Sequence, residues 1–238
     1  MLERFGRLAR GPSRRRSSQR EVGRGIAFLR RWELESALRA FDAAIELDPG
    51  NPIAWNNRGV VLENFGRIEE ALRSHNRAIK LRPTYGDAWC NKGVALMHLG
   101  RMDRAVACFD EVLRTRPHHS LSLLNKGIVY SRAGRHEQGL LYFERALEAD
   151  PELALAAVSK ASALFAMRRY EDAIASYTVA LRKRPDLGRV WLQMGRALLA
   201  AGQPKTAVQC FEKAIRLEPD LPNATAYLKQ ARAQARGT

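Results

Sequence analysis

Six prolines recur every 34 residues along the chain, at Pro49, Pro83, Pro117, Pro151, Pro185 and Pro219. No insertion or deletion interrupts the intervals, so the chain is expected to consist of near-identical structural units. Counting back from each proline gives six units, at residues 18–51, 52–85, 86–119, 120–153, 154–187 and 188–221. Stacked repeats bury apolar surface against their neighbours and present an extended surface for binding. The period therefore favours a binding protein over an enzyme with one central pocket.

Each unit is expected to contain two amphipathic helices. In the second unit the first helix is predicted over residues 52–65, with Asn51 as its N-cap and Pro52 at its first position. Gly66 is expected to end this helix, because glycine accepts the left-handed conformation that commonly ends a helix. The second helix is predicted over residues 69–81, where the approaching Pro83 prevents its continuation.

Small residues occupy one position of each helix, which predicts close contact between the two helices of a unit. They are Gly59, Gly93, Gly127, Ala161 and Gly195 in first helices, and Ala71, Ala105, Gly139, Ala173 and Ala207 in second helices. Glycine inside a helix costs about 1 kcal/mol relative to alanine, so its recurrence indicates a packing requirement. The large residues expected in the core are Trp55, Trp89, Trp191, Phe41, Phe109, Phe143, Tyr177 and Phe211.

These residues stand at fixed offsets within each unit. The sixth unit, for example, has Trp191, Gly195, Leu198, Ala207, Phe211, Ala214 and Pro219. In period and pattern, residues 18–221 resemble the tetratricopeptide repeat family. The resemblance implies an all-α fold, a right-handed α-solenoid of tandem helix-turn-helix repeats, and a non-catalytic scaffold for protein–protein interaction. The first and fifth units depart from the pattern, with Trp32 and Arg168 in place of the turn glycine.

In this family the first helices line a concave inner groove, and this geometry identifies candidate peptide-binding residues by position. A polar row contains Asn57, Asn91, Asn125, Ser159 and Gln193. A second row contains Ile26, Val60, Val94, Ile128, Ser162 and Arg196, and a third contains Val22, Asn56, Cys90, Leu124, Val158 and Leu192. Met97 is expected to add apolar contact area. The partner is therefore expected to be a protein or peptide in an extended conformation.

The asparagines of the polar row carry the sharpest functional signal. A carboxamide both donates and accepts, so one in each unit can bind the repeating N–H and C=O groups of an extended peptide. The row is similar to the asparagine ladder in the repeat domain of the O-linked N-acetylglucosamine transferase family. The alternative is that these amides bond to the adjacent unit and hold the units together, and the two roles are compatible. A clamp for a C-terminal carboxylate, as in co-chaperone repeats, is not expected, because its cations are absent. The matching positions hold Asn56 and Val60, then Asn91, then Leu121 and Asn125.

The two ends of the chain differ from the repeats. Residues 222–236 are expected to form an amphipathic capping helix, and the capping-box pattern of Ser18 and Glu21 predicts the start of the first helix. Residues 1–17 carry six Arg and one Glu and are expected to form a basic, flexible tail. Binding of nucleic acid or an anionic membrane through the Arg-rich ends, or organellar targeting, are alternatives for this segment. About half of the net charge of +15 lies at the two ends, so nucleic acid is not expected as a partner of the repeats.

Other chemistry has little support in the sequence. Three cysteines without CxxC spacing fit a reducing compartment, which predicts a cytoplasmic protein without disulfides. No motif for catalysis, metal binding or phosphate binding is recognised, so neither enzyme activity nor a cofactor is expected. The sequence contains no run of 18 consecutive apolar residues, so no transmembrane segment is predicted. A regulatory domain acting on a separate enzyme chain stays open as an alternative.

Overall fold

The computed structural model describes residues 12–236, which form α-helices joined by short turns, without a β-strand in that range. The chain divides after Thr115 into two compact units. Unit 1 contains α1 (Pro12–Arg30), α2 (Leu34–Leu47), α3 (Pro52–Asn64), α4 (Ile68–Leu81), α5 (Gly86–His98) and α6 (Met102–Thr115). Unit 2 contains α7 (Ser120–Arg132), α8 (His136–Ala149), α9 (Ala154–Ala166), α10 (Tyr170–Lys183), α11 (Gly188–Ala200), α12 (Pro204–Leu217) and α13 (Ala224–Arg236).

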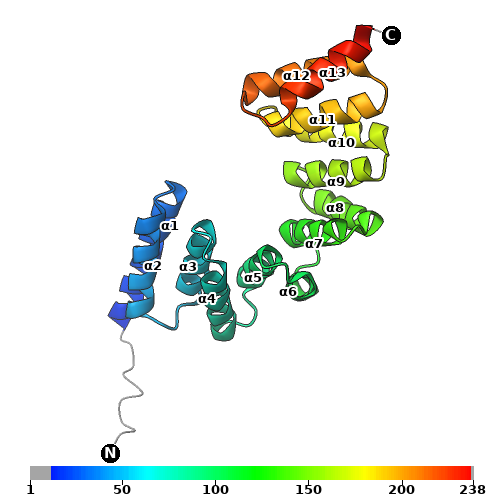
Figure 1. Ribbon diagram of the computed structural model, residues 1–238. Helices are drawn as coiled ribbons and strands as arrows, with labels where there is room; N and C mark the ends of the chain where they lie inside the picture. Colours follow the sequence, from blue (N-terminus) through cyan, green and yellow to red (C-terminus); the bar gives the residue numbers. More distant parts are fainter. Residues whose placement is uncertain (1–11, 237–238) are drawn as a thin grey trace, which may run out of the picture. The chain divides into compact units, whose positions relative to one another are not determined.

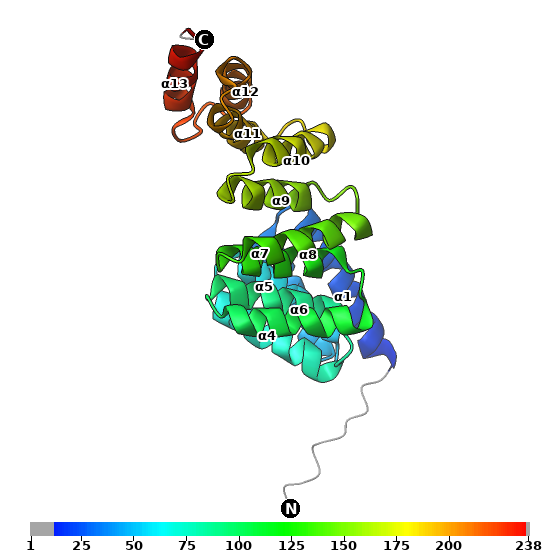
Figure 2. The same cartoon turned by 90° about the vertical axis from the view of Figure 1, so that its right-hand side faces the viewer.

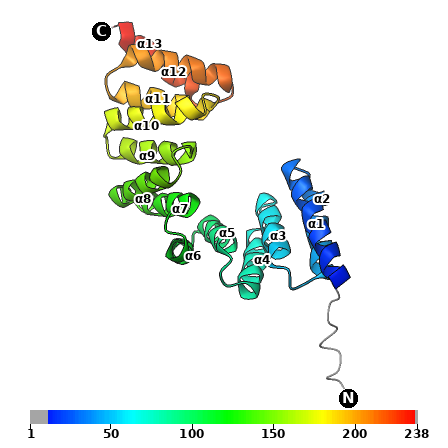
Figure 3. The ribbon, with the colours of Figure 1, turned by 180° about the vertical axis from the view of Figure 1, so that it is seen from behind.

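Consecutive helices pair as hairpins within each unit, as Figure 1 shows for α3 with α4 and for α11 with α12. Figure 3 shows the same pairing for α1 and α2 from the opposite side. The all-α class and the helix-turn-helix repeat predicted from the sequence are confirmed for residues 12–236. Within residues 12–236 no helix combines the length and apolar character needed to cross a membrane.

The predicted helix boundaries of the second hairpin agree with the structure to within one residue. The Asn51 side chain accepts hydrogen bonds from the backbone N–H of Ile53 and Ala54, at 3.0 and 3.3 Å. This N-cap satisfies donors that have no partner inside the helix. At the other end, Gly66 has a φ of 72°, the left-handed conformation expected of a residue that ends a helix. The two signals fix α3 between Asn51 and Gly66.

The small residues of the first helices allow the aromatic residues of the second helices to reach the helix backbone. A Cβ atom on Gly93 would lie 2.5 Å from the ring of Phe109, and one on Gly195 would lie 2.5 Å from the ring of Phe211. Real Cβ atoms do not approach other atoms so closely. The predicted packing requirement is therefore confirmed, and the rings of Phe41, Phe109, Phe143, Tyr177 and Phe211 are buried.

The tryptophans have a different environment from the other aromatic residues. Trp55, Trp89 and Trp191 are only half-buried. The indole N–H of each donates to the carbonyl of the proline six residues earlier, at 3.0, 2.8 and 2.9 Å respectively. Each tryptophan thus holds the start of a first helix against the loop that precedes it, which explains why Trp and Pro recur together.

Helix α1 begins earlier than expected. The prediction that it starts at Ser18 is wrong, because α1 begins at Pro12 and the side chain of Ser18 is buried inside the hairpin. The Ser18 hydroxyl donates to the carbonyl of Ala44 on α2 at 2.8 Å and accepts from the Asn51 amide at 3.2 Å. Residues 12–17 of the predicted flexible tail are therefore helical, and residues 1–11 of that tail lie outside the described range.

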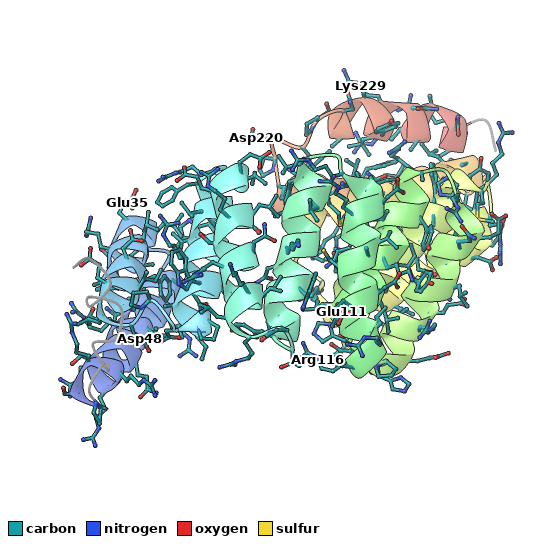
Figure 4. All side chains as sticks on the ribbon, turned by 90° about the horizontal axis from the view of Figure 1, so that it is seen from below. Glu35, Asp48, Glu111, Arg116, Asp220 and Lys229 are labelled. Carbon is teal, nitrogen blue, oxygen red and sulfur yellow. The ribbon has the colours of Figure 1, made fainter. Side chains whose placement is uncertain are left out.

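The predicted capping helix is α13, which packs on α12 at the end of unit 2 (Figure 2). Ala224 and Ala231 are buried in a cluster with Phe211 of α12. The opposite face is polar, and Lys229 on this face is exposed (Figure 4). The apolar side of the last hairpin is thus covered, as a repeat array requires.

Candidate peptide-binding site

The polar row has different environments at its two positions in unit 1. The Asn57 amide donates to the carbonyl of Ile53 in its own helix, at 2.9 Å. The Asn91 amide on α5 donates instead to the side-chain oxygen of Asn56 on α3, at 3.1 Å. Asn91 therefore holds the second and third hairpins together, which is the alternative role considered for this row.

The polar row continues in unit 2 with Asn125, Ser159 and Gln193. All three side chains are half-buried. The Gln193 side-chain oxygen accepts from the guanidinium of Arg196 at 2.7 Å. The same guanidinium lies 5.3 Å from the centre of the Phe165 ring and 5.5 Å from that of Tyr227. Gln193 and Arg196 thus hold each other in place beside α9 and α13.

Most of the third predicted row does not face solvent. Asn56, Cys90 and Leu124 are 5, 6 and 1% exposed, and Met97 is 8% exposed. The third row precedes the polar row by one residue, which is a rotation of about 100° around the helix. That rotation turns Asn56, Cys90 and Leu124 into the interior. Their burial, and that of Met97, argues against the prediction that these residues contact a ligand. Val158, the remaining member chosen from this row, is half-buried.

The aliphatic row is the most accessible of the apolar rows. Val60 and Val94 in unit 1 and Ile128 in unit 2 are half-buried. In unit 2, three predicted residues, Ile128, Val158 and Ser159, line one cavity of about 310 Å³ between α7, α8 and α9. The structure therefore brings these predicted residues together at a single site.

Side chains from all three helices complete this cavity. Its other lining residues are Ser131, Arg132, His136, Phe143, Ser162 and Ala163. The Ser131 hydroxyl lies 3.1 Å from Nδ1 of His136, which positions the imidazole at the start of α8. The site combines an apolar wall with hydroxyl, imidazole and guanidinium groups, which is the usual composition of a ligand site.

A buried tyrosine supports the far wall of the cavity. The Ser162 hydroxyl donates to the carbonyl of Val158 at 3.0 Å, so the Tyr177 hydroxyl, 3.2 Å away, is the donor to Ser162. Burial raises the pKa of Tyr177, which keeps its hydroxyl protonated for this hydrogen bond. This contact fixes Ser162 in one orientation at the cavity edge.

Ser131, Arg132 and His136 were not predicted as site residues. Ser131 and Arg132 lie in the last turn of α7, and His136 begins the second helix α8, from which no candidate was chosen. One signal was present: His136 is polar where the corresponding residues of other hairpins are Ile68, Met102 and Tyr170. No group of three or more His, Cys, Asp or Glu side chains in residues 12–236 has a geometry that could hold a metal ion.

The chain matches three family profiles, each described as a tetratricopeptide repeat. The first profile covers residues 84–152, the second covers residues 22–85 and 124–187, and the third covers residues 164–235. The comparison with curated proteins gave no match.

Several solved structures have the same fold at low sequence identity. A chain in the crystal structure of the APC/C hetero-tetramer Cut9–Hcn1 is 18% identical with a TM-score of 0.83, over 90% of this chain and 43% of that one. This chain therefore spans less than half the length of that relative. PilF of Pseudomonas aeruginosa is 21% identical with a TM-score of 0.78, over 93% and 99% of the two chains. YrrB, described as a TPR protein with an unusual peptide-binding site, is 21% identical with a TM-score of 0.60, over 81% and 100%.

Proposed function

Because this chain belongs to the tetratricopeptide repeat family, we propose that it is a protein-interaction scaffold that binds extended peptide segments along its first helices. The observation that carries the proposal is the cavity between α7, α8 and α9, where Ile128, Val158 and Ser159 meet. These residues come from positions that the family geometry assigns to peptide contact. The description of YrrB as having a peptide-binding site supports the same function.

The cavity offers two kinds of interaction to a peptide. Ile128, Val158 and Phe143 form an apolar wall against which a side chain can pack. Ser159 and Arg132 offer polar groups for the peptide backbone, each hydrogen bond contributing about 1 kcal/mol net. Together with Asn125, which precedes the cavity on α7, these contacts give an expected affinity in the micromolar range, about −8 kcal/mol.

The asparagine ladder has a smaller part in this proposal than the sequence alone suggests. Asn91 already bonds to Asn56, so it contributes mainly to the packing of hairpins in unit 1. Asn57 and Asn125 are the asparagines of the row that we propose for backbone contact. Recognition then combines these amides with the side chains of the cavity.

The test is a selection from a random twelve-residue peptide display library with the full chain as bait. The affinity of the selected peptides is then measured for the wild type and for variants. Val158→Asp places a charge on the apolar wall and is expected to weaken binding at least about tenfold. The matched control is Val179→Asp on α10, which is exposed and lies outside the cavity lining.

Two results would overturn the proposal. One is that the selected peptides bind the wild type and Val158→Asp with equal affinity, while circular dichroism shows that Val158→Asp and Val179→Asp are folded. The other is equal loss of affinity in Val158→Asp and Val179→Asp.

A further inference from the structure

A contact between consecutive hairpins recurs at a fixed register. In the second hairpin, Arg58 of α3 pairs with Asp42 of α2 at 2.7 Å, across 16 residues of sequence. In unit 2, Lys160 of α9 pairs with Glu144 of α8 at 2.9 Å with the same spacing. Each pair neutralises a half-buried cation of a first helix by a carboxylate of the preceding second helix.

The same register in the third hairpin contains a cation without its carboxylate. Lys92 of α5 corresponds to Arg58, but the residue 16 positions earlier is Asn76. In the sixth hairpin the register holds Thr178 and Met194, so there the cation is absent along with the acid. Four such pairs of positions each lie inside one unit. Of these four, only the pair of Asn76 and Lys92 has the cation of the first helix without the carboxylate of the preceding second helix.

Lys92 stands in a cavity of about 480 Å³ between α4, α5 and α6 of unit 1. Its ammonium lies 4.9 Å from the centre of the Trp89 ring, which holds it over an aromatic face. Leu72, Leu96 and Cys108 are buried and form the apolar floor. The cavity is lined by residues that are distinct from those of the α7–α9 site.

The charges around this cavity are unbalanced. Arg101 is paired with Glu69 at 2.9 Å. Glu111 of α6, labelled in Figure 4, is paired with Arg114 at 2.7 Å, and this hydrogen bond lowers the pKa of the carboxyl. Arg104 also lines the cavity and forms no ion pair with another residue of the described chain. Lys92 and Arg104 therefore present two positive charges that the rest of the cavity does not neutralise.

We propose that this cavity is a second binding site, which takes an acidic peptide segment of a partner protein. A carboxylate of the partner occupies the place that Asp42 takes beside Arg58 and pairs with Lys92 and Arg104. An apolar side chain next to that carboxylate packs on Trp89 and the floor. Two free cations beside Glu111 suit one or two carboxylates better than a continuous phosphate backbone, which favours an acidic peptide over nucleic acid.

The test uses an array of seven-residue peptides with two Asp or Glu and one Leu or Phe in all spacings. Each has a counterpart in which Asn and Gln replace the acids. The full chain is expected to bind a subset of the acidic peptides about tenfold better than their amide counterparts, and more weakly at high salt. Equal binding of the two sets would overturn the proposal.

Three variants locate the site. Asn76→Asp restores the missing carboxylate and is expected to abolish the preference for acidic peptides without loss of stability, because Asp42 and Arg58 already show that arrangement. Lys92→Met introduces the residue found at Met194 and is expected to have the same effect on binding. The reciprocal variant Asp42→Asn frees Arg58 and is expected to create a second site of the same kind.

Thermal unfolding first checks that each variant is folded, so that a change in binding can be assigned to the cavity. Unchanged acidic-peptide binding in both folded variants, Asn76→Asp and Lys92→Met, would contradict the proposed site. Self-association of the wild type in sedimentation, lost in Asn76→Asp, would replace the partner peptide by a second copy of the chain and overturn the proposal. Val158→Asp serves as a control here, because it alters the α7–α9 cavity and leaves the Lys92 cavity intact. The two proposals thus fail independently.

Discussion

The ring of His75 lies directly against the backbone of Gly59. A Cβ atom on Gly59 would be 2.4 Å from Cε1 of His75. The ring is also held at both nitrogens, with Nδ1 3.1 Å from the Asn56 oxygen and Nε2 3.0 Å from a carboxylate oxygen of Glu63. Phenylalanine or tyrosine fills this position in the other hairpins, so His75 adds polar contacts to the same close packing.

This contact predicts a large effect of one methyl group. Gly59→Ala is expected to lower the free energy of unfolding by about 1–3 kcal/mol, because the bonded ring cannot move away from the new Cβ. Helix propensity alone would favour alanine by about 1 kcal/mol. Gly23→Ala on α1 is the matched control, since a Cβ there meets no atom within 4 Å and the variant is expected to be more stable. Urea unfolding of both variants checks the prediction, and stabilisation by Gly59→Ala would contradict it.

Two of the turns inside hairpins contain a non-glycine residue in the left-handed backbone conformation. Trp32 and Arg168 have φ values of 61°, at the position where other hairpins have glycine. The left-handed conformation costs a non-glycine residue about 1–2 kcal/mol. Part of this cost is offset because glycine loses more backbone entropy on folding. Arg168→Gly is therefore expected to raise the free energy of unfolding by up to about 1 kcal/mol. Gly134→Ala, at a φ of 76°, is expected to lower it, and equal signs for the two changes would refute the explanation.

The two asparagines of unit 1 are predicted to differ in their effect on stability. Asn91→Ala removes a hydrogen bond between α5 and α3 and is expected to cost about 1 kcal/mol. Asn57→Ala removes a bond to its own helix and gains helix propensity, so its effect on stability is expected to be close to zero. Thermal unfolding compares the two variants directly. Equal destabilisation of the two variants would contradict the prediction that the hydrogen bond between Asn91 and Asn56 stabilises the packing of the hairpins.

Buried thiols make the stability sensitive to alkaline pH. Burial raises the pKa of Cys108 and of Cys210 from 9.0 to about 11. The folded protein therefore keeps both thiols protonated where the unfolded chain loses its protons. The resulting stabilisation is present below about pH 9 and is lost as the pH rises toward 11. The double variant Cys108→Ala and Cys210→Ala is expected to have a shallower fall in stability over this range, and an identical slope would contradict the assignment.

The sequence predicts the helices because their boundaries depend on local chemistry. Asn51, Gly66 and Pro83 determine where helices begin and end, and the structure confirms all three. Ser18 does not start α1 but lies inside it, and its hydroxyl donates to the distant carbonyl of Ala44 on α2. A capping-box pattern cannot reveal that this serine is needed inside a hairpin.

The candidate site is predictable only in part for a similar reason. Ile128, Val158 and Ser159, chosen by position in the repeat, line one cavity, and their role as peptide contacts stays a prediction. The burial of Asn56 and Leu124 depends on the rotation of each helix against its neighbours, which position alone leaves open. His136 reaches the cavity from the following helix, and its sequence signal was a polar residue where other hairpins have Ile68, Met102 and Tyr170.

The most direct test of peptide binding along the first helices is site-specific photo-cross-linking. A photoreactive benzophenone amino acid replaces Arg132, which is exposed at the α7–α9 cavity, or Leu141, which is exposed on α8 and outside the cavity lining. With a peptide from the display selection, we expect a covalent adduct from position 132 and none from position 141. Adducts from position 141 alone, or equal adducts from both, would contradict this expectation.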